Sequence, residues 1–199
     1  MAMSNSRKGV TLRPAVYLDR DGTINVEKDY LYKIEDFEFI PGAPEAIKRL
    51  KDAGFLVVVV TNQSGVARGY YTLEDVERLH VYLSTCLVKY NAAVDGYYVC
   101  PHHPDEGSGE LTMDCACRKP KPGMLLDAAA DLGVDLHRSW MVGDKVADVE
   151  AGSEAGVRPL MVATGYGLKA QASMQHDSVH LFPSIVEAVE YILDVTVAL

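Results

Sequence analysis

The stretch that decides the fold is Ala15-Val16-Tyr17-Leu18-Asp19-Arg20-Asp21-Gly22-Thr23, an apolar run that leads directly into two aspartates. The apolar residues predict a buried strand, and the glycine after the second aspartate permits a sharp turn. In open α/β sheets, ligands bind beyond the carboxyl ends of the strands, so Asp19 and Asp21 stand where chemistry is expected. One carboxylate of such a pair can attack a substrate while the other transfers a proton.

Apolar runs and helical patterns alternate along the rest of the chain. Further strands are predicted at 55–60, 94–100, 140–142 and 159–163, and helices at 43–52, 72–90, 123–132, 146–155 and from 183 onward. This alternation predicts an α/β fold, with a parallel sheet and helices on both faces. Thr61 follows the second predicted strand and Asp144 follows the fourth, so both are expected at the same sheet edge as Asp19.

The composition limits the classes of protein to consider. A chain of 199 residues with 48% hydrophobic residues can form one domain, expected over 14–199 after a flexible arm at 1–13. The net charge of −9 argues against a general nucleic-acid or anionic-membrane surface. We find no apolar run near the roughly 20 residues of a membrane-spanning helix and no secretory signal, so a cytoplasmic monomer is expected.

Three aspartates at neighbouring strand ends predict a metal site. The carboxylates of Asp19, Asp21 and Asp144 would repel one another unless a cation lay among them. Hard oxygen ligands with open positions suit Mg²⁺, which also takes phosphate oxygens as ligands. The Thr61 hydroxyl and the Lys119 ammonium could then hold a phosphoryl group in transfer.

A second cluster predicts a structural zinc site in the loop 100–117. The sequence Cys100-Pro101-His102-His103 is followed, after a twelve-residue spacer from His102, by Cys115-Ala116-Cys117. Three thiols and one imidazole complete a tetrahedral zinc set with no position left for water. Reduced cysteines without a metal are the alternative. A bound zinc would fix this loop so that Arg118 and Lys119 point at the phosphoryl pocket.

These motifs resemble those of the haloacid dehalogenase (HAD) phosphatase superfamily. The first motif matches Asp19-x-Asp21-Gly22-Thr23, the second Thr61, the third Lys119 and the fourth Gly143-Asp144-x-x-x-Asp148. The resemblance implies a HAD-like Rossmannoid sheet in which Asp19 is the nucleophile that forms an aspartyl-phosphate and Asp21 is the acid and base. It also implies Mg²⁺ bound by Asp19, the Asp21 backbone carbonyl and Asp144, with Thr61 and Lys119 holding the phosphoryl group. Asp148 would orient Lys119.

Longer matches resemble the D-glycero-D-manno-heptose 1,7-bisphosphate 7-phosphatase family. They include residues 19–25, 61–69, 100–104, 117–125 and 142–145. The family pattern places the zinc ligands at Cys100, His102, Cys115 and Cys117. The short spacing between the motifs leaves no room for a large cap domain, so specificity is expected in the loops 25–35, 62–71 and 101–118. Its substrate contacts map onto Glu27, Lys28, Asp29, Tyr30, Thr61, Asn62, Gln63, Ser64, Arg118, Lys119 and Lys145.

The implied reaction releases the 7-phosphate and leaves heptose 1-phosphate for nucleotide-activated heptose and lipopolysaccharide core synthesis. Arg118 is the expected site for the distal 1-phosphate, because its guanidinium offers a fork of donors. The amides of Asn62 and Gln63 are expected to bind sugar hydroxyls.

Three other functions are weighed against this interpretation. Histidinol-phosphate phosphatases share the type of zinc loop, but the twelve-residue spacer and the continuation 64–69 favour the heptose family. A catalytically dead phosphate-binding protein would lack a carboxylate or Lys119, and the chain retains them. An interaction protein built around the zinc loop is supported only by the basic residues at 118–121, which a phosphatase explains better.

Overall fold

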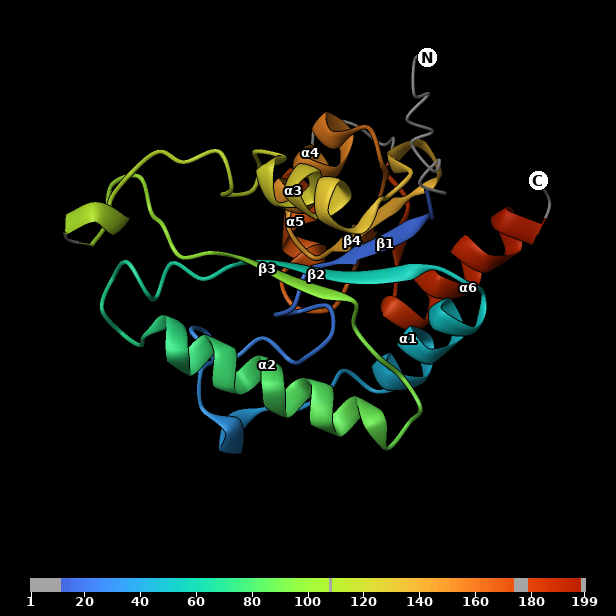
Figure 1. Ribbon diagram of the computed structural model, residues 1–199, viewed down its shortest axis with the longest axis horizontal. Helices are drawn as coiled ribbons and strands as arrows, with labels where there is room; N and C mark the ends of the chain where they lie inside the picture. Colours follow the sequence, from blue (N-terminus) through green and yellow to red (C-terminus); the bar gives the residue numbers. More distant parts are fainter. Residues whose placement is uncertain (1–11, 108, 174–178, 198–199) are drawn as a thin grey trace, which may run out of the picture.

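The computed structural model describes residues 12–107, 109–173 and 179–197. Within these residues, six parallel strands form one sheet in the order β3-β2-β1-β4-β5-β6 (Figure 1). Their bounds are β1 Ala15–Leu18, β2 Leu56–Asn62, β3 Gly96–Cys100, β4 Trp140–Gly143, β5 Arg158–Val162 and β6 Leu181–Phe182. Because β1 pairs with both β2 and β4, the residues that follow these three strands meet at one sheet edge.

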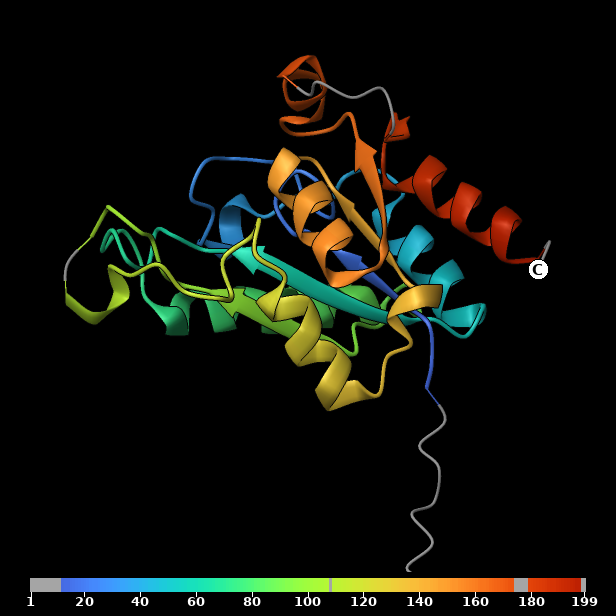
Figure 2. The ribbon, with the colours of Figure 1, turned by 90° about the horizontal axis from the view of Figure 1, so that it is seen from above.

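Helices cover both faces of the sheet (Figure 2). Their bounds are α1 Ala43–Asp52, α2 Leu73–Val88, α3 Gly123–Leu132, α4 Val146–Ala155, α5 Gly167–Ser173 and α6 Ile185–Val197. One hydrophobic cluster joins the sheet to α1, α2 and α6, and a second joins its other face to α3 and α4. The predicted parallel α/β fold is confirmed.

The central strand β1 is apolar throughout because both of its faces are buried. Val16 and Leu18 pack in the first cluster, whereas Ala15 and Tyr17 pack in the second. Successive side chains of a strand point to opposite faces, so a strand covered on both faces needs apolar residues at every position. Asp19 is the first polar residue, and it comes directly after the strand ends.

The C-terminal part contains two elements that the sequence did not predict. Helix α5 begins at Gly167, after β5, and β6 adds a sixth strand beside β5. A two-residue strand is too short to show a hydrophobic period. The last helix begins at Ile185 rather than at 183, because the Ser184 hydroxyl accepts the backbone N–H of Val186 at 3.1 Å and so caps the helix.

The arm expected over 1–13 lies outside the described residues except for its last two. There the backbone of Arg13 bonds to that of Gly133 and Asp135. Within the described residues there is no large cap domain. The segment between β1 and α1 holds a 3₁₀ turn at Ile34–Asp36, and the loop between β3 and α3 projects from one end of the sheet (Figure 1). No helix in the described ranges is long and apolar enough to cross a membrane.

Candidate active site

The carboxyl ends of β1 and β4 bring three buried aspartates together. Asp19 follows β1, Asp144 follows β4 and Asp148 lies in the first turn of α4, with carboxylate oxygens within 4.8 Å of one another. The Lys119 ammonium lies 2.9 Å from Asp19 Oδ1 and 2.6 Å from Asp148 Oδ1. Burial lowers the pKa of Lys119, but the charges of Asp148 and Asp19 outweigh it and raise that pKa. Lys119 therefore stays charged and offsets part of the negative cluster.

Asp144 is fully buried and only partly hydrogen-bonded. Its Oδ2 accepts the backbone N–H of Tyr166 at 2.8 Å, whereas its Oδ1 has no hydrogen-bond partner among the described residues. Burial, followed by the charge of Asp19, raises the pKa of Asp144 to about 7. A Cβ at Gly22 or Gly165 would overlap the Asp144 carboxylate. A buried carboxylate oxygen without a hydrogen-bond partner, close to Asp19, is the kind of ligand that a hard cation such as Mg²⁺ takes.

Lys145 adds a second ammonium beside the aspartates. Its Nζ lies 3.1 Å from Glu27 Oε2, 3.7 Å from Asp144 Oδ1 and 3.9 Å from Asp19 Oδ2. Its side chain is 40% exposed, so an anion entering from solvent can reach it. Lys145 and Lys119 thus place two ammonium groups among the carboxylates of the site, where they can contact an anionic group.

Asp21 is held by four hydrogen bonds from three side chains. Arg20 donates twice, from Nε to Oδ1 at 3.1 Å and from Nη2 to Oδ2 at 2.8 Å. Asn25 donates to Oδ1 at 2.9 Å and Gln63 to Oδ2 at 3.0 Å. Burial raises the pKa of Asp21, but the Arg20 guanidinium and these hydrogen bonds outweigh it and lower that pKa. The carboxylate is therefore fixed in orientation beside Asp19.

Residues at the carboxyl end of β2 hold other parts of the site in place. The Gln63 amide nitrogen also donates to Thr61 Oγ1 at 2.8 Å, and its carbonyl oxygen accepts the Tyr71 hydroxyl at 2.7 Å. Asn62 binds the backbone of Lys119 on both sides, donating to its carbonyl oxygen at 2.9 Å and accepting its N–H at 3.1 Å. Both side-chain amides, expected to bind sugar hydroxyls, are thus engaged by the protein itself.

A cavity of about 350 Å³, here called the active-site cavity, opens above these residues. It is lined by Asp21, Glu27, Asp29, Tyr30, Asn62, Gln63, Ser64, Tyr71, Arg118, Lys119, Lys145, Ala147 and Tyr166. The lining includes most of the substrate contacts expected from the sequence. Thr61 is buried below it. Lys28 is outside the lining in the described part of the chain, because its ammonium pairs with Glu38 at 3.1 Å.

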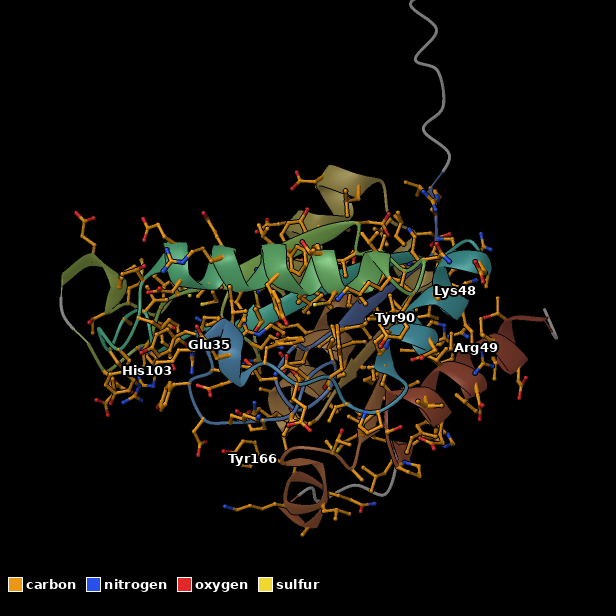
Figure 3. The ribbon with its side chains drawn as sticks, turned by 90° about the horizontal axis from the view of Figure 1, so that it is seen from below. Glu35, Lys48, Arg49, Tyr90, His103 and Tyr166 are labelled. Atoms are coloured by element: carbon orange, nitrogen blue, oxygen red, sulfur yellow. The ribbon has the colours of Figure 1, made fainter. Side chains whose placement is uncertain are left out.

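Tyr166 is a cavity residue that the sequence analysis missed. Its hydroxyl donates to Asp29 Oδ1 at 2.7 Å, and Lys145 Nζ lies 5.2 Å from its ring centroid. It lies close before α5 (Figure 3). Asp29 and Tyr30 have φ angles of 44° and 55°, which non-glycine residues seldom adopt. Tyr166 therefore joins the loop after β5 to this strained turn. The strand-end rule could have located it, since it follows the fifth predicted strand.

The structure brings Cys100, His102, Cys115 and Cys117 into one cluster. Three sulfur–sulfur and sulfur–nitrogen distances are 3.5 Å for Cys100–Cys115, 3.2 Å for Cys115–Cys117 and 3.4 Å for Cys117–His102 Nδ1. Ligands at about 2.1–2.3 Å from one zinc ion would lie about 3.4–3.8 Å apart at tetrahedral angles. The spacing is close to this range, so the four residues fit a zinc ion.

The neighbouring His103 is engaged elsewhere. Its Nδ1 accepts the backbone N–H groups of Asp105 and Glu106, and its Nε2 lies 3.3 Å from Arg68 Nη2. It lies in the loop that projects from the sheet (Figure 3). Arg118, which follows the last cysteine, donates to the His102 carbonyl oxygen at 3.1 Å. The cluster is thus directly connected to a cavity residue.

Comparisons with known proteins agree with this geometry. Residues 116–188 match the HAD-hydrolase-like family model. The D-glycero-beta-D-manno-heptose-1,7-bisphosphate 7-phosphatase of Haemophilus ducreyi is 44% identical over 182 residues, 90% of this chain and 98% of the relative. The enzyme of the same name from Escherichia coli K12 is 46% identical over 165 residues, 82% of this chain and 86% of the relative.

A solved structure extends the similarity to three dimensions. The D,D-heptose 1,7-bisphosphate phosphatase of B. bronchiseptica, complexed with magnesium and phosphate, has a TM-score of 0.81 and 36% identity. The match covers 91% of this chain and 98% of that one. The chain therefore belongs to the D-glycero-β-D-manno-heptose-1,7-bisphosphate 7-phosphatase family of HAD-like phosphomonoesterases.

Proposed function

We propose that the protein hydrolyses the 7-phosphate of D-glycero-β-D-manno-heptose 1,7-bisphosphate. The observation that carries the proposal is the geometry at the ends of β1 and β4, where Lys119 lies between Asp19 and Asp148. Asp21 lines the active-site cavity together with Lys119. The relatives from H. ducreyi and E. coli supply the substrate and its β configuration through their names.

Asp19 and Asp144 would hold Mg²⁺, together with the backbone carbonyl of Asp21. The unpartnered Asp144 Oδ1 supports this assignment, and the B. bronchiseptica relative contains magnesium. When bound, the ion would neutralise charge on the carboxylates and on the phosphoryl oxygens.

The chain's own residues account for the two chemical steps. Asp19 attacks phosphorus and forms an aspartyl-phosphate as the bond to the oxygen at carbon 7 breaks. Asp21 gives a proton to that leaving oxygen; it holds this proton when the anionic phosphate binds beside it, because the negative charge opposes the lowering of its pKa by Arg20. Asp21 then takes a proton from water, which attacks the phosphorus and releases inorganic phosphate and free Asp19. Lys119 and the Thr61 hydroxyl stabilise the transferring phosphoryl group, because their positions are fixed before the substrate arrives.

The distal 1-phosphate would bind Arg118. This guanidinium lines the active-site cavity, and its bond to the His102 carbonyl oxygen leaves other donors for an anion. Lys145, which also lines the cavity and lies near Asp19 and Asp144, would add positive charge near the reacting phosphate.

Zinc would bind Cys100, His102, Cys115 and Cys117 in a structural role. The ligand set leaves no position for water.

We further propose that residues 14–199 act as one domain in a cytoplasmic monomer and that the product enters nucleotide-activated heptose and lipopolysaccharide core synthesis. The names of the bacterial relatives support the sugar substrate on which this last step depends.

The test is phosphate release in the presence of Mg²⁺ from the α and β anomers of heptose 1,7-bisphosphate and from histidinol phosphate. We expect fastest turnover of the β anomer, with the 1-phosphate left intact and with Asp19→Asn inactive. Preference for histidinol phosphate would overturn the substrate assignment and leave the mechanism standing. Turnover by Asp19→Asn at the rate of the unchanged enzyme would overturn the mechanism.

A further inference from the structure

Arg20, between the two aspartates of the first motif, is a fully buried cation. Its guanidinium donates to both oxygens of Asp21, and Nη2 also donates to the Leu31 carbonyl oxygen at 3.1 Å. The remaining nitrogen, Nη1, lies 3.3 Å from Nε2 of His80. A buried charge needs a hydrogen-bond partner for each polar group, because water cannot supply one. His80 therefore supplies an acceptor to the one guanidinium nitrogen that neither Asp21 nor Leu31 contacts.

The chemistry of the pair fixes the state of the His80 ring. A guanidinium can only donate hydrogen bonds, so Nε2 must accept and the proton of the neutral ring must be on Nδ1. Burial, followed by the charge of Arg20, lowers the pKa of His80 to about 3. His80 is therefore a permanent acceptor at neutral pH.

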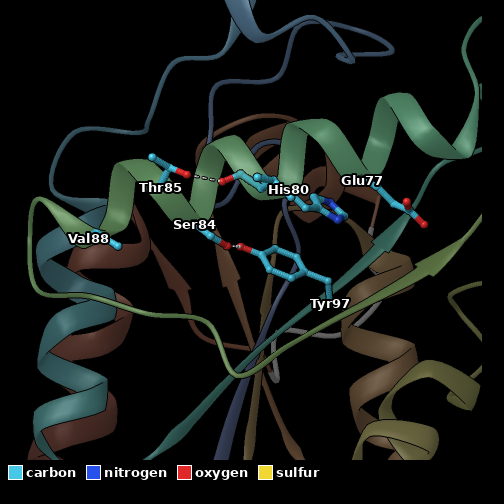
Figure 4. Close-up of a pocket in the computed structure, with 7 residues that line it drawn as sticks. Glu77, His80, Ser84, Thr85, Val88 and Tyr97 are labelled. Atoms are coloured by element: carbon cyan, nitrogen blue, oxygen red, sulfur yellow. Dashed lines mark hydrogen bonds between the residues drawn. The ribbon is translucent and has the colours of Figure 1, made fainter.

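Contacts on α2 and β3 hold the ring in this orientation. It stacks on Tyr97 at a centroid distance of 4.4 Å and an interplanar angle of 16°. The Tyr97 hydroxyl in turn lies 2.8 Å from Ser84 Oγ (Figure 4). These residues line a surface groove of about 560 Å³ together with Glu77, Val81, Thr85 and Val88. His80 is absent from the described lining of the active-site cavity.

We propose that His80 is a positioning residue for the phosphatase reaction. It fixes the Arg20 guanidinium, and through it the carboxylate of Asp21, at the angle needed for proton transfer to the leaving oxygen. This inference rests on the proposed function of Asp21. Without an acceptor for Nη1, the guanidinium would turn toward another partner and lose its two-point contact with Asp21. His80 does not line the active-site cavity in the described part of the chain, so its replacement should change the rate of the chemical step and not the binding of substrate.

The proposal is tested with three variants of the full-length protein. His80→Leu removes the acceptor, whereas His80→Gln keeps a carbonyl oxygen at nearly the same reach as Nε2. Thr85→Val is the matched control, because Thr85 lies on the same helix and in the same groove, and its hydroxyl bonds only to the Val81 carbonyl oxygen among the contacts described. Urea unfolding of all three shows whether each is folded under assay conditions.

Two substrates separate positioning from general damage. An alkyl phosphate, such as the heptose bisphosphate, needs a proton on its leaving oxygen. The p-nitrophenolate of p-nitrophenyl phosphate leaves as a stable anion and needs none. For His80→Leu we expect kcat on the alkyl phosphate to fall about tenfold with KM within twofold, and kcat/KM on p-nitrophenyl phosphate to stay within threefold. His80→Gln should recover most of kcat, and Thr85→Val should match the unchanged protein.

An equal loss on both substrates, no loss on either, or a failure of His80→Gln to recover kcat would overturn the inference. The proposed function fails separately, if the unchanged protein does not hydrolyse the heptose bisphosphate. In that case any alkyl phosphate that it does hydrolyse replaces the bisphosphate in the comparison of variants, and the test of His80 keeps its meaning.

Discussion

Replacing His80 by glutamine should make the protein less sensitive to acid. The ordinary pKa of histidine is 6.5, and in the folded protein that of His80 is lowered to about 3. Between these values the unfolded chain binds a proton that the folded protein does not bind. The neutral ring therefore contributes fully to the free energy of unfolding when the pH is above the histidine pKa of the unfolded chain. This contribution is lost as the pH falls below that pKa.

The expected magnitude follows from the two pKa values. Integrating proton uptake from pH 7 to pH 5 gives a loss of about 2 kcal/mol in the free energy of unfolding. The result changes little if the folded pKa is one unit higher, because the unfolded chain dominates the uptake in this range. The charges that face the ring are Arg20 and Asp21, and Glu77 lines the same groove. The loss should therefore be absent from His80→Gln, which retains these groups and cannot titrate at this position.

The assay is urea unfolding at pH 7 and pH 5, followed by circular dichroism. Asp144 also titrates in this range, but both proteins contain it, so its contribution cancels in the difference. The exposed His137 provides a control, since His137→Gln should keep the pH dependence of the unchanged protein. Parallel loss of stability in His80→Gln and the unchanged protein would refute the reasoning, because it would mean that the folded protein protonates His80 normally.

Three further predictions follow from the site. Asp148→Asn should lower the free energy of unfolding by about 3 kcal/mol in urea titrations, because it removes one partner of the buried Lys119 charge, while the exposed Glu150→Gln should not. Tyr166→Phe should raise KM for the bisphosphate about threefold at constant kcat, because the bond to Asp29 is lost; an unchanged KM would exclude this role. His102→Ala should reduce the zinc measured per chain by mass spectrometry, whereas His103→Ala should retain it; equal zinc in both would contradict the ligand set.

The sequence predicted the elements whose residues are buried on both faces. The run 15–18 and the run at β4 are apolar at each position, so their place in a parallel sheet could be inferred directly. The polar residues that follow such strands could be inferred for the same reason. β6 was missed because its two residues show no period. Tyr166 was missed because only its position after the fifth predicted strand, and not its residue type, points to the site.

The sequence could not show which side chains are already engaged. From the sequence alone, the side-chain amides of Asn62 and Gln63 could bind a sugar. In the structure, both amides form hydrogen bonds with other parts of the protein. The partnership of Arg20 and His80 is also invisible in the sequence, because 60 positions separate the two residues. Such contacts depend on how α2 packs against the sheet. The hydrophobic pattern of the sequence does not determine which residues of the helix meet which residues of the sheet.

These contacts explain how a fold without a large cap can hold a site ready for phosphoryl transfer. Asp21 is held through Arg20 by α2, Lys119 by Asn62 from β2 and by Asp148 from α4, and Asp144 by the backbone after β5. Each group is thus fixed by an element other than its own before the substrate enters. Preorganised charges need no rearrangement during the reaction. The avoided cost of rearrangement accounts for most of their effect on the rate. Damage to these supports should therefore lower kcat more than it raises KM, whereas damage to Asp29 or Arg118, which face the substrate, should do the reverse.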